Sequence, residues 1–459
     1  MKSAFKWLGL VVGVLFLAAA VIFMAARLQG PTAAQRDAVA KMQVVTKPAG
    51  RNAFAALWLL PYDVPEAEQE AVAAEDVRRY TPMAITFPDS GADGYTEFVS
   101  VAESRYPDLR IEGKDAPEYC GWRDEGCLAK VSANKEAYAA LLARDARLIE
   151  RVAALSQYGH VRNKFAAGWD MPIPAYQLLS RTLTRNAHDF AMGNLDAALA
   201  GTCRDASTAR MLMRSGDHLI GSMVAVSMLQ GTAQLLADML ATLPAGHPLP
   251  ASCVQAFAPP ADRELTICNA MRNEYKITGT GTLRSIYSSE RDKSWLRAVQ
   301  LWFVYNEEKT FALSATNFAR WCGEDAASMQ RQDIAILPAS LPMVEPSPWS
   351  MQCIDNAAGC ILTKIAAPAY SDYQLRLQDS GARLRLAGAL LRLREHASGS
   401  VSMPQLLATL PEKYANKRRN LRVSDDGKSL VIDMYETNRN ETWQVPLPPY
   451  LISDRAAAP

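Results

Sequence analysis

Residues 7–26 of the chain are WLGLVVGVLFLAAAVIFMAA, a run of twenty residues without a single charge. An α-helix of that length covers about 30 Å, which is the thickness of the hydrocarbon core of a bilayer. The rest of the chain has the mixed polar and apolar composition of a soluble domain. The run therefore predicts one transmembrane helix that carries one large domain.

The residues around this run distinguish an anchor from a cleaved signal peptide. Lys2 and Lys6 precede it, as basic residues do in a secretory signal. A cleaved signal has a shorter apolar core, followed by a cleavage site of small residues. Residues 18–20 are three alanines, but the apolar run continues beyond them to Met24. We therefore favour an uncleaved signal anchor, with residues 1–29 as cytoplasmic tail and membrane helix, over a cleaved peptide.

The flanking charges bear on the orientation of the anchor. Positive charges lie on both sides of the run, so the positive-inside rule gives little preference. The tail of six residues before the run favours a cytoplasmic amino terminus and an exported domain. We accordingly expect a bacterial inner-membrane protein that crosses the bilayer once and has its bulk in the periplasm.

The composition is that of an ordinary globular domain. The 459 residues are 49% hydrophobic and 21% charged, and the formal net charge is +1. This length is ample for a full hydrophobic core in one or two domains. A dedicated nucleic-acid binder would carry a basic excess, so we expect no nucleic-acid partner.

The cysteines support export to an oxidising compartment. They number eight, and an even number in an exported domain predicts disulfides. Two pairs each enclose six residues, with a glycine directly before the second cysteine: Cys120 with Cys127, and Cys353 with Cys360. We expect each of these pairs to close a small loop.

The other four cysteines lie far apart in the chain. Cys203 with Cys253 would join a helix to a later loop, and this pairing leaves Cys268 with Cys322. Other connectivities stay open, because spacing alone does not decide between them. Free thiols or zinc ligands are the alternative, but the C-x₂₋₄-C spacing typical of zinc sites is absent. We expect structural disulfides, and neither a metal nor a cofactor.

Helical periodicity dominates the chain from residue 132 onward. Apolar residues there recur at the spacing of one helix face: Tyr138, Leu141, Leu142, Leu148, Ile149, Val152 and Leu155. Four helices with short connections are predicted next, at 175–192, 195–214, 217–229 and 232–243. Short connections make neighbouring helices antiparallel, so this region predicts a stack of helical hairpins.

Part of this stack resembles a tetratricopeptide helix pair. The resemblance rests on a rhythm of small residue, aromatic residue, glycine and small residues, at Ala187, Phe190, Gly193, Ala197 and Ala198. No second copy follows at a step of 34 residues, the period of that repeat. We therefore expect irregular hairpins rather than a regular solenoid.

Composition divides the chain into segments. Residues 243–260 are rich in proline and mark a boundary within the helical part. Apolar stretches around Asp426 and Gly427 predict a small antiparallel β-meander. The predicted segments are the anchor at 1–29; a stalk, the first helices and a disulfide-looped stretch at 30–131; a helical-hairpin domain at 132–260; a second helical subdomain at 261–400; and the meander with its tail at 401–459. The predicted fold class is mainly α, with stacked hairpins after one transmembrane helix and the small meander.

Two groups of side chains are candidates for binding. Aromatic residues are densest between 295 and 321; such a set usually forms core, but any exposed members would be the best candidate for a partner surface. The candidate residues for this surface are Trp295, Trp302, Tyr305, Phe311 and Trp321. The basic cluster Lys417, Arg418 and Arg419 is expected in a solvated loop, with anionic lipid or an acidic partner as alternatives.

No local arrangement of residues predicts catalysis. The five histidines lack the HExxH motif and other paired metal-ligand spacing, and no G-x-S-x-G motif occurs. We therefore predict no catalytic, cofactor-binding or metal-binding residues. His188 and His218 are the candidates for a site assembled from distant positions, where a serine or a carboxylate would have to join them.

Two hypotheses for function follow from this sequence. The first is a non-catalytic module of the bacterial cell envelope that interacts with a protein partner as a scaffold or an inhibitor, because stacked helices present faces to other chains. The second is an envelope hydrolase that acts on cell wall or lipid. It would need a pocket in which the histidines or carboxylates converge.

Overall fold

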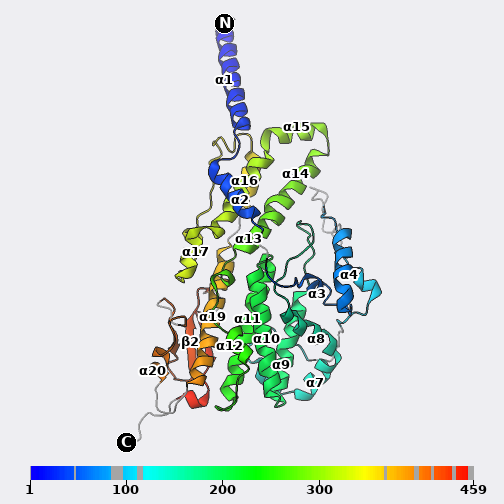
Figure 1. Ribbon diagram of the computed structural model, residues 1–459. Coiled ribbons are helices and arrows are strands. Elements are labelled where there is room, and N and C mark those ends of the chain that lie inside the picture. Colours follow the sequence, from blue (N-terminus) through cyan, green and yellow to red (C-terminus); the bar gives the residue numbers. More distant parts are fainter. Residues whose placement is uncertain are drawn as a thin grey trace.

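The computed structural model describes residues 2–45, 48–83, 97–110, 117–365, 370–396, 403–414, 418–436 and 441–452. The fold is mainly α with a small antiparallel sheet, so the predicted fold class is confirmed. The amino-terminal helix α1 projects from one end of the molecule, whereas β2 and α20 lie toward the other end (Figure 1).

The predicted anchor is a single helix, α1 (Lys2–Leu28). Its apolar side chains are exposed along most of its length, as in a helix surrounded by lipid. The stretch expected to leave the membrane as a stalk contains a second helix, α2 (Ala33–Gln43). Thr32 caps α2, and Ala38 and Met42 are buried where α2 packs against α16 (Glu307–Ala319). The chain after the anchor therefore returns directly to the body of the protein.

Antiparallel hairpins form the centre of the molecule. They consist of α9 (Arg181–Ala191), α10 (Leu195–Ser215) and α11 (Leu219–Thr242). Gly193 and Gly216 make the two turns with φ of 85° and 51°, a left-handed conformation that suits glycine. These hairpins confirm the predicted stack.

One predicted break in this stack is wrong. The sequence suggested separate helices at 217–229 and 232–243, but α11 is continuous through Gly231. A β-carbon at Gly231 would lie 2.7 Å from the carbonyl oxygen of Trp122. The glycine thus allows the first disulfide loop to approach the helix, and it does not end it. Although α11 is long and apolar enough to span a membrane, it is a core helix, because two thirds of its most apolar stretch (67%) is buried.

The long helix α19 (Ser371–Glu395) packs against α11 and carries the sheet. The strands are β1 (Arg422–Val423), β2 (Ser429–Asp433) and β3 (Thr442–Pro446), in the order β1-β2-β3 with antiparallel pairing. Gly427 turns between β1 and β2 with φ of 72°. The predicted meander is therefore confirmed.

The remaining helices surround this centre. They are α3 (Phe54–Trp58), α4 (Glu66–Arg79), α5 (Ala102–Arg105), α6 (Cys127–Ser132), α7 (Lys135–Arg144), α8 (Ala146–Ala154), α12 (Ala251–Ala256), α13 (Cys268–Glu274), α14 (Leu283–Arg291), α15 (Trp295–Val304), α17 (Glu324–Arg331), α18 (Ala357–Ile365) and α20 (Met403–Ala408), with the π-helix η5 (Tyr275–Thr282) between α13 and α14.

All eight cysteines form disulfides, in the pairs that were expected: Cys120–Cys127, Cys203–Cys253, Cys268–Cys322 and Cys353–Cys360. The glycine before the second cysteine has a physical reason in each small loop. Gly126 has a left-handed φ of 68°, and a β-carbon at Gly359 would lie 2.0 Å from Thr310 Oγ1. The disulfides and the apolar amino-terminal helix together indicate an exported, membrane-anchored protein.

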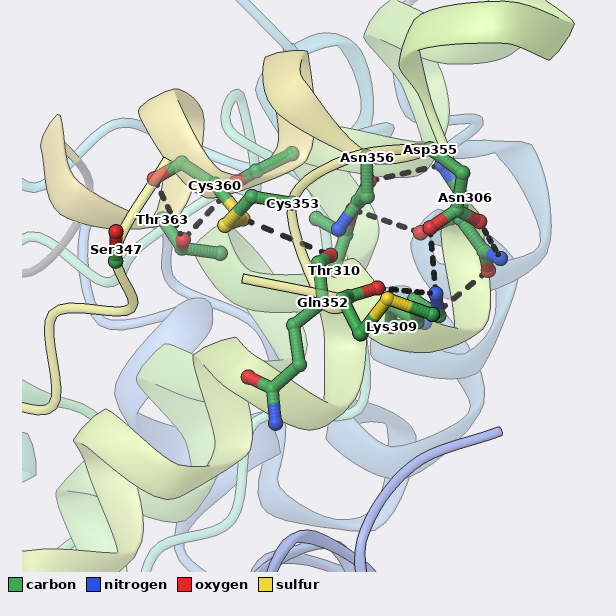
Figure 2. The surroundings of a disulfide bond; sticks show 12 residues. Asn306, Lys309, Thr310, Ser347, Gln352, Cys353, Asp355, Asn356, Cys360 and Thr363 are labelled. Carbon is green, nitrogen blue, oxygen red and sulfur yellow. Dashed lines mark hydrogen bonds and ion pairs between the residues drawn. A yellow bond between two sulfur atoms is a disulfide. The ribbon is translucent and has the colours of Figure 1, made fainter. Parts of the chain in front are cut away.

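A buried charge cluster joins the anchor to the body, and Figure 2 shows Lys309 and Asp355 at its centre. Asp355 lies in the Cys353–Cys360 loop and is fully buried. Lys309 Nζ donates hydrogen bonds to Asp355 Oδ1 at 2.5 Å, to the carbonyl of Ala26 at 2.6 Å and to that of Met351 at 3.1 Å. Because Ala26 ends the apolar run, the last turn of α1 is bonded directly to α16.

Candidate functional site

The candidate site is a cavity of about 870 Å³ in the side of the body. Four separate parts of the chain contribute to its walls: residues 44–45 with 48–50, 159–171, 214–217 and 263–277. The second is a loop, the third is the end of α10 with its turn, and the fourth runs from Arg263 through α13 to the start of η5. Its volume is in the range of small-ligand sites, about 300–1,000 Å³.

Cations outnumber carboxylates in the lining of this cavity. Five cationic side chains line it: Arg162, Arg214, Arg263, Arg272 and Lys276. Among the lining residues that the structure describes, Asp217 is the one carboxylate. Because the whole chain carries a formal charge of only +1, these cations are concentrated rather than typical. A cavity of this kind attracts anions.

Hydrogen bonds orient two of these cations. Arg214 Nη1 donates to Glu264 at 3.0 Å, but that carboxylate also accepts two hydrogen bonds from Arg210, at 3.0 and 2.7 Å. Arg272 donates to the carbonyl of Lys41 at 3.1 Å and to Asn269 at 2.7 Å. Neither bond of Arg272 neutralises its charge.

Asp217 has an unusual acidity. Burial raises its pKa to about 6, although a hydrogen bond from Asn163 N and the charges of Arg162 and Lys276 act in the opposite direction. The backbone nitrogen of Asn163 lies 2.8 Å from the carboxylate. Below pH 6 the carboxyl group is protonated, and the cavity becomes more positive.

The π-helix η5 forms one wall and carries Lys276 and Ile277. The sequence suggested a bend at Gly279-Thr280-Gly281, but these residues continue the helix in π geometry. A β-carbon at Gly281 would lie 3.0 Å from the carbonyl oxygen of Ala167, so the glycine lets the helix approach the second segment of the wall.

The lining of the cavity is also partly apolar. Val44, Val45, Val161 and Met171 line the cavity together with Ile277. Val44 and Val45 are exposed, at 47% and 65%. The cavity therefore suits a ligand that carries both an anionic group and an apolar portion.

The histidines proposed for an assembled hydrolase do not converge. His218 is buried, and its Nδ1 accepts a hydrogen bond from Gly221 N at 3.0 Å, so it caps the start of α11. Its Nε2 lies 3.0 Å from the hydroxyl of Tyr176, and burial lowers the pKa of His218 to about 4. His188 instead contacts the carbonyl of Lys135 at 3.1 Å. These contacts give both histidines structural roles.

The aromatic candidates for a partner surface separate into two groups. Tyr305 and Trp321 are buried, and Phe311 is partly buried. Trp295 and Trp302 are exposed, at 74% and 41%, on the short helix α15. Local spacing could not separate the two groups, because exposure depends on which helix each residue faces.

The cations of the cavity were also missed from the sequence. They come from separate segments, and only Arg272 and Lys276 share a helical spacing of four residues. That pair is the one local signal, and it is a weak one. In the part of the chain that the structure describes, no three His, Cys, Asp or Glu side chains group as a metal site would require.

Comparisons with protein-family models, with curated proteins and with solved structures find no match to this chain.

Proposed function

We propose that this protein is a non-catalytic binding module of the bacterial envelope, anchored in the inner membrane with its bulk in the periplasm. It acts as a scaffold or inhibitor that recognises an acidic segment of a protein partner. The observation that carries the proposal is the cavity in which five cationic side chains face one carboxylate. Four of these cations are arginines, whose planar guanidinium groups bind carboxylates in a bidentate manner.

The contacts of the two candidate histidines support binding rather than turnover. His218 caps a helix, and His188 bonds to a backbone carbonyl. Four disulfides and the bonded anchor make the body rigid, which suits a surface that has to be presented at a set distance from the membrane. A rigid binding surface loses less conformational freedom when a partner binds.

The test is a crosslinking pull-down of the full-length protein from native membranes. The cavity variant combines Arg263→Glu with Lys276→Glu, since both side chains are exposed. The matched control combines Lys130→Glu with Lys428→Glu, which reverses two exposed charges outside the cavity. We expect one stoichiometric partner with the wild type and the control, and its loss with the cavity variant. Retention of the partner by both variants would reject the cavity as the binding site.

Salt provides a second readout of the same proposal. Attraction between exposed charges is screened beyond about 8 Å at physiological ionic strength. Capture of the partner should therefore weaken steeply as the salt concentration rises. An interaction that is indifferent to salt would point to an apolar contact elsewhere on the molecule.

An envelope hydrolase is the second candidate, and Asp217 favours it. This carboxyl group lines the cavity with a pKa raised to about 6, which suits a general acid near neutral pH. Asp217→Asn keeps the shape of the side chain and removes its titration. Turnover of a cell-wall or lipid substrate by the wild type, abolished in this variant, would favour the hydrolase over the binding module.

A further inference from the structure

The helix α15 exposes its large apolar side chains instead of burying them. None of its ten residues is buried. Six large apolar side chains on it are exposed: Trp295, Leu296, Val299, Trp302, Phe303 and Val304. The neighbouring helix α18 exposes Ile361 and Ile365, at 60% and 73%. A contiguous apolar surface of this kind marks a contact with another molecule or with a membrane.

The position of α15 identifies what covers it. The ring of Phe23 lies 5.5 Å from that of Trp302 and 5.4 Å from that of Phe303. Phe23 belongs to the membrane-spanning run and precedes its last residue, Ala26, by three positions. At 1.5 Å per residue this separation is about 4.5 Å along the helix axis. The carboxyl-terminal half of α15 therefore lies at the depth of the final turn of the anchor.

The direction of α15 indicates that the whole helix lies at this depth. Figure 1 shows α15 beside the base of α1 and running across its direction. If α1 crosses the bilayer, a helix across it lies in the membrane plane. Tryptophan is enriched at this level of a bilayer, because its ring is apolar and its N–H is polar.

Charged groups mark the level of the lipid headgroups. The guanidinium group of Arg27 lies 5.1 Å from the centre of the Trp302 ring, and it donates to the carbonyl of Tyr305 at 3.0 Å. Arg297 and Gln300, three positions apart, form a polar stripe on the otherwise apolar helix. Arg297 is exposed and can reach anionic headgroups.

We propose that α15 is an in-plane membrane helix, whose apolar surface lies in the lipid interface beside α1. Its occupant is lipid, because the surface is continuous with the surface of the anchor through Phe23. The bonds of Lys309 and Asp355 attach this end of the body to the anchor, so α15 stays at that depth (Figure 2). The body then rests on the membrane in one orientation instead of swinging on a tether.

The test measures the depth of Trp295 in the full-length protein. The protein is reconstituted in nanodiscs of phosphatidylethanolamine and phosphatidylglycerol, with lipids brominated near the headgroup end of the chain as quenchers of tryptophan fluorescence. Trp295→Phe removes the most exposed ring of α15 and leaves in place Trp302 and Phe303, whose rings lie against Phe23 of the anchor. Trp443→Phe is the matched control, since β3 belongs to the sheet at the opposite end of the molecule (Figure 1).

We expect Trp295→Phe to lower the quenchable fluorescence by the share of one of the nine tryptophans, and Trp443→Phe to leave it unchanged. The outcome that overturns the proposal is equal quenchable fluorescence in the wild type and in Trp295→Phe. The protein is purified, so no partner covers α15 in the nanodisc. If a protein partner and not lipid covers α15 in the cell, Trp295 stays out of the lipid and gives this same negative result. The proposed function does not depend on the outcome, because the cavity variant leaves α15 unchanged.

Discussion

Two clusters of buried charge join distant parts of this chain, one at the base of α1 and one beside the sheet. At the base of α1, Lys309 bonds to one carboxylate, that of Asp355, and to two backbone carbonyls. Beside the sheet, Arg419 bonds to two carboxylates, Asp333 at 2.5 Å and Asp379 at 2.7 Å. Both cations are buried, so each removes a charge from water and depends on its partners.

The two clusters differ in the balance between their cations and their carboxylates. Arg385 adds a second cation to Asp333 at 2.8 Å, so the sheet cluster has two cations and two anions. The anchor cluster has one anion for two cations, because Arg27 also lies 3.5 Å from Asp355. Its excess positive charge faces backbone carbonyls instead. The sheet cluster is thus the more sensitive to loss of its central cation, since Asp379 would lose its cation and Asp333 would keep Arg385 alone.

Arg419→Met should have the largest effect on stability. It leaves Asp379 without its cation and Asp333 with Arg385 alone. Breaking a buried ion pair from one side costs about 3–5 kcal/mol of unfolding free energy. The measurement is urea unfolding of the full-length protein in detergent micelles, followed by circular dichroism.

Lys309→Met is the comparison for that variant. Asp355 keeps Arg27 nearby and a hydrogen bond from Asn306 at 2.9 Å, so we expect a loss of about 1–3 kcal/mol, as for an unsatisfied buried group. A larger loss for Lys309→Met than for Arg419→Met would show that the balance of cations and carboxylates does not determine how sensitive each cluster is.

Opening the Cys353–Cys360 disulfide should have the next largest effect. Alanine at both positions frees a loop with a sequence separation of seven residues, and chain entropy gives about 2.5 kcal/mol for so small a ring. Because Asp355 lies in this loop, the double variant should also weaken the effect of Lys309→Met when the two are combined. Strictly additive losses in unfolding free energy would mean that the disulfide does not position Asp355.

The sheet cluster also shows where sequence reasoning ends. Local patterns were sufficient for the anchor, the hairpins, the meander and the two cysteine pairs that close small loops, because each depends on run length, periodicity or spacing. Arg419 was expected in a solvated loop and is instead buried; Lys417 of the same cluster lies outside the described residues. Its partners lie 86 and 40 residues away in the chain. In the sequence, an arginine of a solvated basic cluster cannot be distinguished from one that forms a buried ion pair, because its carboxylate partners lie far away in the chain.

The candidate site illustrates the same limit. Its cations come from separate segments that meet only because α10, α13 and the loop at 159–171 pack together. No local spacing predicts that convergence. The surface of α15 is an intermediate case, since its aromatic density was visible in the sequence but its depth beside Phe23 was not.

The buried carboxyl group of Asp205 is a third case beside the two clusters, because an amide and not a cation donates a hydrogen bond to it. Burial raises the pKa of Asp205 to about 7, whereas hydrogen bonds from Thr182 and Asn186 and the charge of Arg204 lower it. Asn186 donates to it at 2.8 Å. In the unfolded chain this carboxyl group titrates near its ordinary pKa of 3.8. The folded protein therefore keeps a proton between about pH 4 and pH 7 that the unfolded chain has released.

The sign of the resulting pH dependence is determined by that raised pKa. The stabilisation is complete below the unfolded pKa and is lost as the pH rises through the folded pKa, by at most about 1.4 kcal/mol per pH unit. Asp205→Asn does not titrate, so the wild type should lose stability relative to this variant as the pH rises from 5 to 7. His218, whose pKa is lowered to about 4, has the opposite trend but is present in both proteins. A difference in unfolding free energy that is independent of pH would contradict the assignment.

The smallest effect is expected at an exposed ion pair near the anchor cluster. Lys364 lies 2.7 Å from Glu345, and the two side chains are 66% and 53% exposed. Pairs of this kind contribute about 0.2–1 kcal/mol, since water solvates both charges whether or not they meet. We expect Lys364→Ala to change the unfolding free energy by no more than that, and high salt to remove the difference. If Lys364→Ala proved as destabilising as Lys309→Met, proximity to the membrane rather than burial would determine the strength of these pairs. The contrast between the two buried clusters would then need an explanation in the electrostatics of the lipid surface.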